Sequence, residues 1–294
     1  MPELPDVTVY IEALAARVGG KPLAGVRIVN PFVLRTVDPP IDRLVGERIT
    51  GVRRMGKRIV IEFSGNLFLV IHLMIAGRLR WRPPGGNVTR PAPLARFEFD
   101  DGVLVFTEAG KKRRASMHLV KGEENLVQFD RGGLEVLDAS LEAFADRLTS
   151  ENHTLKRSLT DPTLFSGIGN AYSDEILHRA RLSPLLLTSR LTEEQIAQLH
   201  AAVREVLVEW TDRLREESAG EFPEKVTAFR EGMAVHGRFR QPCPVCGAPV
   251  QRIRYADNET NYCARCQTGG RLLADRAMSR LLKQDWPRSL DEVE

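Results

Sequence analysis

Two pairs of cysteines near the C-terminus constrain the local fold more than any other feature of the chain. They occur in Cys243-Pro-Val-Cys246 and Cys263-Ala-Arg-Cys266, and 16 residues separate the two pairs. Two Cys-x-x-Cys pairs at this spacing indicate a site in which four thiolates hold one zinc ion tetrahedrally. Because the chain has four cysteines in all, every thiol is used and the zinc is structural. Redox-active dithiols are the alternative interpretation of the same pairs.

The remaining length leaves room for further domains. A chain of 294 residues suffices for about two domains, each with its own core. No apolar run reaches the roughly 20 residues of a membrane span. Glu3 and Asp6 stand where a signal peptide would carry basic residues. These features predict a cytoplasmic protein without a membrane partner.

The net charge of +3 is too small to indicate a partner, but the basic residues are clustered. One cluster is Arg53-Arg54-Met55-Gly56-Lys57-Arg58 and the other is Lys111-Lys112-Arg113-Arg114. Such clusters are candidate phosphate contacts. Solvated loops are the alternative interpretation.

The hydrophobic pattern changes twice along the chain. Residues 5–18 have helical spacing and end at Gly19-Gly20, whereas residues 25–120 contain short apolar stretches separated by turn residues. Two pairs of these stretches flank turns as hairpins do, 58–63 with 66–73 and 94–99 with 103–107. Several short strands at this spacing indicate a sandwich or barrel.

Beyond Gly132-Gly133 the pattern becomes helical. Helices are predicted at 141–148, 155–161, 171–180, 193–210 and 272–282, with a polar, linker-like stretch at 215–224. The expected fold class is therefore α+β, in four parts. These are an N-terminal β-sandwich with a leading helix (1–133), a helical domain (134–234), a four-cysteine zinc finger (235–268) and a C-terminal tail (269–294).

The first residues carry a candidate nucleophile. Removal of Met1 leaves Pro2 with a free secondary amine, and an α-amino group titrates near 7.7–8, far below lysine. Its uncharged fraction can attack a sugar C1′ or a carbonyl and form an iminium. Glu3 lies beside it as a possible proton donor or acceptor. The alternative is that Pro2 and Pro5 only open a helix, where proline is tolerated.

A glycine-rich turn lies between two of the predicted helices. In Ser166-Gly-Ile-Gly-Asn170, the glycines permit a tight turn and Asn170 stands at a helix N-terminus. The free backbone N–H groups of such a terminus can hold an anion such as a phosphate.

Together and in this order, these features resemble the formamidopyrimidine-DNA glycosylase and endonuclease VIII family of base-excision repair enzymes. The motifs are the N-terminal Pro-Glu, the lysine of Met-Gly-Lys-Arg, the Gly-x-Gly-Asn-x-Tyr helix–two-turn–helix and the four-cysteine finger. The resemblance covers nearly the whole chain apart from the tail after Cys266. It implies a monomer of the bacterial cytosol or nucleoid that binds double-stranded DNA containing a damaged base or an abasic site.

The resemblance also implies roles for individual residues. Pro2 matches the nucleophile that displaces the base and forms the Schiff base, and Glu3 matches the acid/base that acts on the sugar. Lys57 matches a hairpin lysine that approaches the lesion and its phosphate; an exposed strand lysine is the alternative. Phosphate contacts are implied for three further residues, His72, Lys156 and Asn170. A satisfied structural histidine is the alternative for His72.

The chain departs from the family in the finger. The family usually has an arginine five residues before the third cysteine, where it reaches the lesion phosphate and serves a second elimination. Here the position is Asn258, which is uncharged. Arg254 or Arg271 are candidate substitutes, so all three are candidate DNA contacts. Delta-elimination is therefore not assigned.

The residues that fill the gap left by an extruded base differ as well. The family's His-Leu-Gly-Met is here His72-Leu73-Met74-Ile75, so Met74 or Ile75 is the candidate wedge. The family's Arg-Arg-Phe is here Arg113-Arg114-Ala115, without an aromatic ring. Gap-filling side chains offset part of the cost of base flipping, so an altered lesion preference is expected and 8-oxoguanine is not assigned.

The leading hypothesis is a DNA glycosylase with AP-lyase activity that works through a Pro2 Schiff base and beta-elimination. The main rival is a non-catalytic binder of damaged or abasic DNA on the same scaffold. A zinc-dependent protein-interaction module is a third possibility, with little support beyond the finger.

Overall fold

A computed structural model describes the chain except for residues 111, 225, 227–229, 256–257, 274–288 and 293–294. Its contacts group into two compact units. The first contains Met1–Arg131 and Trp210–Thr227, and the second contains Gly132–Glu209 and Ala228–Glu294. The division into four parts by sequence stays a prediction.

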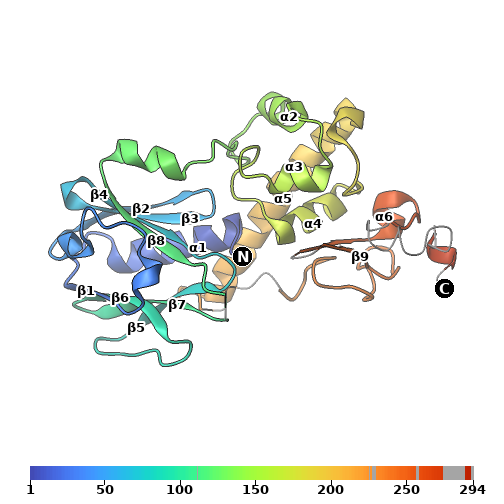
Figure 1. Cartoon of the computed structure of the whole chain (residues 1–294). Coiled ribbons are helices and arrows are strands. Elements are labelled where there is room, and N and C mark those ends of the chain that lie inside the picture. Colours follow the sequence, from blue (N-terminus) through green and yellow to red (C-terminus); the bar gives the residue numbers. More distant parts are fainter. Residues whose placement is uncertain (111, 225, 227–229, 256–257, 274–288, 293–294) are drawn as a thin grey trace. The chain divides into compact units, whose positions relative to one another are not determined.

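The first unit is a β-sandwich preceded by a helix, as predicted (Figure 1). One sheet has the order β1-β6-β7-β5 and the other β2-β3-β4-β8, and all neighbours are antiparallel. The elements are α1 (Leu4–Val18), β1 (Gly25–Ile28), β2 (Ile49–Met55), β3 (Arg58–Phe63), β4 (Leu67–His72), β5 (Gly77–Arg82), β6 (Pro93–Phe99), β7 (Gly102–Glu108) and β8 (Ser116–Lys121).

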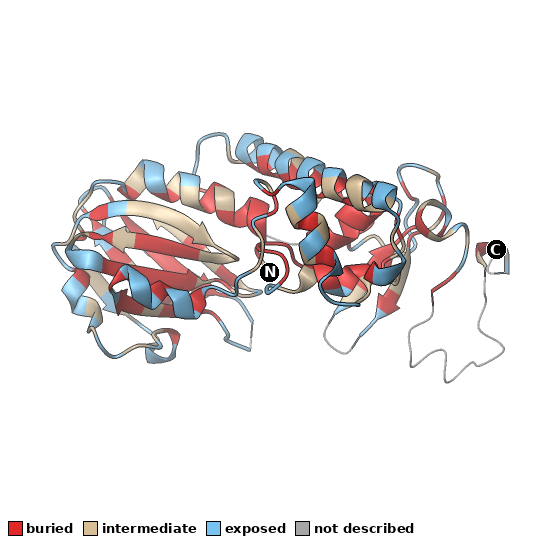
Figure 2. Cartoon of the chain, turned by 90° about the horizontal axis from the view of Figure 1, so that it is seen from above, coloured by how far each residue is buried: buried red, intermediate tan, exposed pale blue. Residues whose placement is uncertain are grey.

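Alternation along the strands builds the core of this unit. Ile59, Ile61 and Phe63 of β3 point into the main core, while Val60 between them belongs to a smaller cluster on the other face. Tyr10 of α1 is fully buried in the main core. Figure 2 shows buried residues concentrated along the strands of this unit.

The stretch predicted to be a linker, 215–224, is instead part of the first unit. Helix α5 (Glu193–Ser218) continues eight residues beyond the predicted end because Leu214 still lies on its buried face. The chain then packs back onto the sandwich. The ring of Phe222 lies 5.8 Å from that of Tyr10, and Glu224 forms ion pairs with Arg80 and Arg82 of β5. The prediction was wrong because it used only the local polarity of the stretch, whereas the contacts with Tyr10 and β5 join residues far apart in the sequence.

The second unit combines helices with the zinc-finger hairpin. Its elements are α2 (Leu141–Thr149), α3 (Leu155–Thr160), α4 (Asn170–Arg179), the first part of α5, β9 (Gln251–Arg254), β10 (Glu259–Tyr262) and α6 (Ala264–Thr268). Strands β9 and β10 pair antiparallel. The helix predicted at 272–282 lies mostly outside the described residues. Across the described parts of both units, no helix is long and apolar enough to cross a membrane.

Candidate active site and zinc site

The N-terminus is fixed by the first turn of α1. Glu3 is the N-cap of this helix and is 2% exposed. Its backbone N–H donates to Asp6 Oδ2 at 2.9 Å, and its carboxylate accepts the backbone N–H of Asp6. This reciprocal capping box determines where Pro2, the residue before the cap, is held. Pro2 is buried and Met1 is half-buried.

The surroundings of the N-terminus favour an uncharged amine. Burial lowers the pKa of the Met1 amino group, and the nearby charges of Arg78 and Lys57 lower it further, while Glu3 and Asp6 act in the opposite direction. An amine with a lowered pKa is more often unprotonated, and therefore nucleophilic, at neutral pH.

Lys57 and His72 lie in the same part of the sandwich. Lys57 follows Gly56 in the turn between β2 and β3, rather than on a strand. His72 ends β4 and is paired with Arg58 of β3. Burial lowers the pKa of His72 to about 4, helped by the charges of Arg58, Lys57 and His118. Lys57 thus acts electrostatically on both the N-terminus and His72, and His72 is neutral at pH 7.

The two candidate wedge residues follow β4. Met74 has a φ of 53°, and Ile75 is 63% exposed. The guanidinium of Arg78 donates to the carbonyl of Ile75 at 3.2 Å and so restrains the backbone of this loop. Sequence reasoning missed Arg78, because an arginine on an ordinary strand carries no motif.

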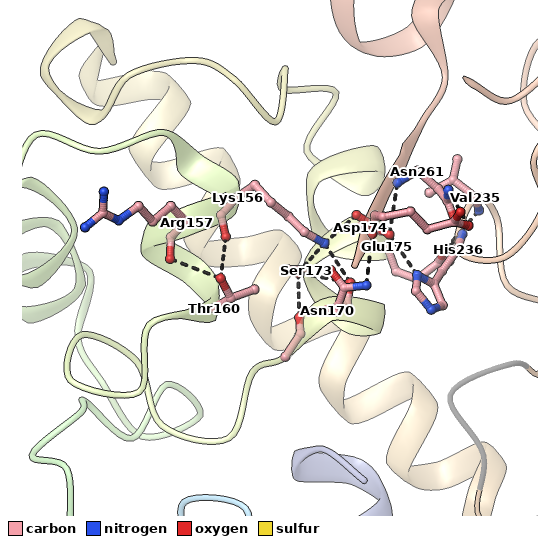
Figure 3. Close-up of polar contacts among 12 residues, drawn as sticks. Lys156, Arg157, Thr160, Asn170, Ser173, Asp174, Glu175, Val235, His236 and Asn261 are labelled. Atoms are coloured by element: carbon pink, nitrogen blue, oxygen red, sulfur yellow. Dashed lines mark hydrogen bonds and ion pairs between the residues drawn. The ribbon is translucent and has the colours of Figure 1, made fainter. Parts of the chain in front are cut away.

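In the second unit, Lys156 is held in a buried network (Figure 3). Its Nζ donates to the Asn170 carbonyl at 2.7 Å, to Ser173 Oγ at 2.8 Å and to Asp174 Oδ1 at 2.5 Å. Three acceptors match the three N–H bonds of an ammonium group. A direct contact between Lys156 and a phosphate, as the resemblance implies, would require one of these bonds to be given up.

The same network joins α4 to the finger. Asp174 Oδ2 accepts from His236 Nδ1 at 2.7 Å and from the backbone N–H of Asn261 at 3.1 Å. The Glu175 carboxylate accepts the backbone N–H groups of three consecutive residues, 234–236. Asn170, the first residue of α4, donates its side-chain amide to the Glu259 carbonyl at 2.9 Å. Two buried carboxylates therefore hold the finger against the helix that follows the glycine turn.

The four cysteines converge as predicted. Their sulfur atoms all lie within 4.8 Å of one another, with 3.9 Å between Cys243 and Cys266 and 3.4 Å between Cys246 and Cys263. Zinc–sulfur bonds of about 2.3 Å in a tetrahedron place sulfurs about 3.8 Å apart. These separations are too long for disulfides and fit one zinc ion. Without a cation, burial raises the pKa of Cys263 to about 11, so the ion is needed to keep that thiolate.

The remaining candidate DNA contacts are exposed. Arg254 ends β9 and Asn258 precedes β10, so both lie at the hairpin end. Arg271 follows α6, and its backbone forms an antiparallel β-bridge with Ser289, so it does not lie on the hairpin. Arg252, the other arginine of β9, already has partners within the protein. Its guanidinium lies 4.1 Å from the centre of the Phe239 ring and 3.4 Å from the Glu259 carboxylate. Of the two candidate substitutes for the missing arginine, Arg254 is the one the structure places on the hairpin.

A low-pKa amine beside a buried carboxylate suits attack on a sugar carbon, and a zinc finger fixed to a helix–two-turn–helix suits nucleic-acid binding. The class of protein in which these occur together is the DNA glycosylase. Three family models match the chain in order. They are the formamidopyrimidine-DNA glycosylase N-terminal domain over residues 1–115, the H2TH domain over 134–214 and the zinc finger found in FPG and IleRS over 240–269. The chain belongs to the formamidopyrimidine-DNA glycosylase family.

Individual relatives agree with this membership. Formamidopyrimidine-DNA glycosylase of Solibacter usitatus is 33% identical over 275 residues, which cover 91% of this chain and 99% of that protein. A formamidopyrimidine-DNA glycosylase-like protein of Mycobacterium tuberculosis is 43% identical over 152 residues, 51% of this chain and 94% of that protein. A Lactococcus lactis FPG mutant bound to DNA containing Fapy-dG superposes with a TM-score of 0.81 at 26% identity, covering 91% of this chain and all of that one. The family is one of base-excision repair glycosylases with AP-lyase activity.

Proposed function

We propose that the chain, once Met1 is removed, excises damaged bases from duplex DNA with Pro2 as the nucleophile. The Pro2 nitrogen attacks C1′ of the damaged nucleotide and the base leaves with the bonding pair of its C1′–N bond. The C1′–O4′ bond then breaks and O4′ takes a proton, so that the opened sugar is joined to the protein as an iminium. Loss of a proton from the sugar then expels the 3′ phosphate by beta-elimination. The observation that carries this proposal is the capping box of Glu3 and Asp6, which fixes the residue next to Pro2 with its carboxylate buried, in surroundings that lower the pKa of the N-terminal amine.

Glu3 is the proton-transfer group in this proposal. Its carboxylate is buried directly after the nucleophile and capped by the Asp6 N–H, which fixes its position. A carboxylate held in this way can take a proton from the sugar or from the attacking amine. Lys57 completes the catalytic group by supplying positive charge at the N-terminus.

We propose that phosphate contacts come from residues of both units. Lys57 and His72 serve in the first unit, and Asn170, Arg254 and Asn258 in the second. His72 contacts phosphate as a neutral donor, given its lowered pKa. Lys156 positions α4 through its bonds to the Asn170 carbonyl and to Asp174, and Arg271 forms a β-bridge with Ser289, outside the finger hairpin.

The substrate class is duplex DNA that contains a damaged base or an abasic site, acted on in the bacterial cytosol by a monomer. The Lactococcus relatives were solved with DNA containing Fapy-dG or an abasic site. In this chain, Ile75 is an exposed apolar side chain on a loop supported by Arg78, and we propose it as the wedge that fills the gap.

One observation favours the rival, a non-catalytic binder: Asn258 is exposed and uncharged where the family has arginine. Strand nicking and binding, measured on the same abasic-site duplex, distinguish the enzyme from the non-catalytic binder. The proposed function predicts strand cleavage with a beta-elimination end, abolished when Met1 is retained. Salt-sensitive binding without cleavage would identify the rival instead.

A further inference from the structure

Helix α4 contacts the zinc site directly through a histidine. His178 lies near the C-terminal end of α4 and is 7% exposed. Its Nε2 is 3.3 Å from Cys243 Sγ, and Cys243 is itself buried. The contact joins residues 65 positions apart in the sequence, one from the helix–two-turn–helix and one from the first cysteine pair.

The chemistry of the contact is determined by the sulfur. A zinc-bound cysteine is a thiolate, which accepts hydrogen bonds and has no proton to donate. The imidazole nitrogen that faces it must therefore carry the N–H. Four thiolates around one Zn²⁺ leave a net charge of about −2. A buried N–H donor to one of them offsets part of that charge, as partners of metal ligands commonly do.

The second cysteine pair is connected to the end of α4 by hydrogen bonds to backbone atoms, rather than by a contact with a ligand sulfur. Gln267 accepts the Cys263 backbone N–H at 2.8 Å and donates to the carbonyl of Leu182, shortly after α4, at 2.9 Å. This link touches only backbone atoms. His178 is the side chain of α4 that reaches a ligand sulfur among the described contacts.

We propose that His178 is a positioning residue of the zinc site, whose Nε2–H donates to the Cys243 thiolate and makes the helix–two-turn–helix part of the metal's environment. The site so defined has four cysteine ligands and one outer donor. The inference concerns metal binding and stands whether or not Pro2 is the nucleophile.

Cobalt substitution tests the donor in the full-length protein. His178→Phe removes the N–H and keeps a planar ring, while His178→Gln keeps an N–H at similar reach. His200→Phe is the matched control, because His200 is a histidine of the same unit whose Nε2 lies 3.0 Å from the Ala139 carbonyl rather than a thiolate. Metal affinity by chelator competition and the sulfur-to-cobalt charge-transfer bands are recorded for all four proteins.

The proposal predicts about 10-fold weaker metal binding in His178→Phe, the lower range for loss of such a partner, with charge-transfer bands moved to lower energy. In His178→Gln, most of the metal affinity and of the original band energy is retained. In His200→Phe, both quantities equal those of the unaltered protein. Equal changes in the His178→Phe and His200→Phe proteins, or no change in either, would overturn it.

A second measurement uses the unaltered sequence, and so tests the proposal even if His178→Phe does not fold. In protein loaded with ¹¹³Cd, a proton on His178 Nε2 that is hydrogen-bonded to a ligand sulfur shows scalar coupling to the metal. The coupling is expected. An imidazole protonated only at Nδ1 would refute the proposal.

Discussion

The ammonium group of Lys156 lies 2.5 Å from Asp174 Oδ1, and solvent reaches 11% of the lysine side chain and none of the aspartate's. Lys156 belongs to α3 and Asp174 to α4, the helix that begins at Asn170. Asp174 also accepts hydrogen bonds from His236 and Asn261 of the finger segment. Removing one partner of a buried ion pair leaves the other charge uncompensated, which commonly costs about 3–5 kcal/mol.

We expect Lys156→Met to destabilise the second unit by about 3 kcal/mol, because Asp174 loses its principal counter-charge. The urea dependence of amide exchange in α4 measures this without assuming that both units unfold together. Arg157→Met, one position further on the same helix at an exposed site, is the control and should change stability little. If Lys156 were only a phosphate ligand, its loss would leave stability intact and reduce the salt dependence of DNA binding.

Glu3→Gln separates proton transfer from capping. A glutamine oxygen can still accept the Asp6 N–H, so α1 should keep its start. Base release should fall about 10²–10⁴-fold, the usual contribution of a positioned acid or base. Single-turnover base release, with duplex affinity measured in parallel, checks both parts. Unchanged base release would remove Glu3 from the mechanism.

The ring of His72 should titrate near pH 4 rather than near 6.5, since burial and the charges of Arg58 and Lys57 oppose protonation. A histidine with a depressed pKa stays neutral in the folded state while the unfolded chain takes up a proton. It therefore lowers stability as pH falls through 6.5 towards 4, by about 2 kcal/mol at pH 5. NMR titration of the ring signals, assigned with His72→Gln, checks the pKa. A midpoint above 7 would mean that His72 is mostly a cation at neutral pH and meets phosphate in that form.

Asn258→Arg should restore a charge at the exposed end of the finger hairpin. We expect tighter binding of abasic duplex and a salt dependence steeper by about 0.9 in log–log slope, the value for one added phosphate contact. Titration at several salt concentrations measures the slope, and Asn258→Gln is the uncharged control. An unchanged slope would show that this position does not meet the backbone. The appearance of a delta-elimination end in the arginine variant would link that residue to the second cleavage.

Local patterns in the sequence predicted most of the elements and the zinc site. The period of the hydrophobic residues predicted α1 and the strands β3, β4, β6 and β7, and the Cys-x-x-Cys spacing predicted the sulfur cluster, because each depends on residues close in sequence. The contacts of Glu224 with β5 and of His178 with Cys243 were not predictable in this way, since they join residues at least 65 positions apart. Lys156 shows what a motif cannot predict. Its position in the sequence matches that of a phosphate ligand, but in the fold its ammonium group is hydrogen-bonded to Asp174.

The most direct test of the central claim is borohydride reduction of the protein mixed with abasic-site duplex DNA, followed by peptide mass spectrometry. The account predicts a covalent adduct on the amine of Pro2 in chains that have lost Met1. It predicts none in chains that retain Met1 or carry an N-terminal extension. An adduct on Lys57 or another lysine, or strand cleavage that persists with a blocked N-terminus, would contradict it.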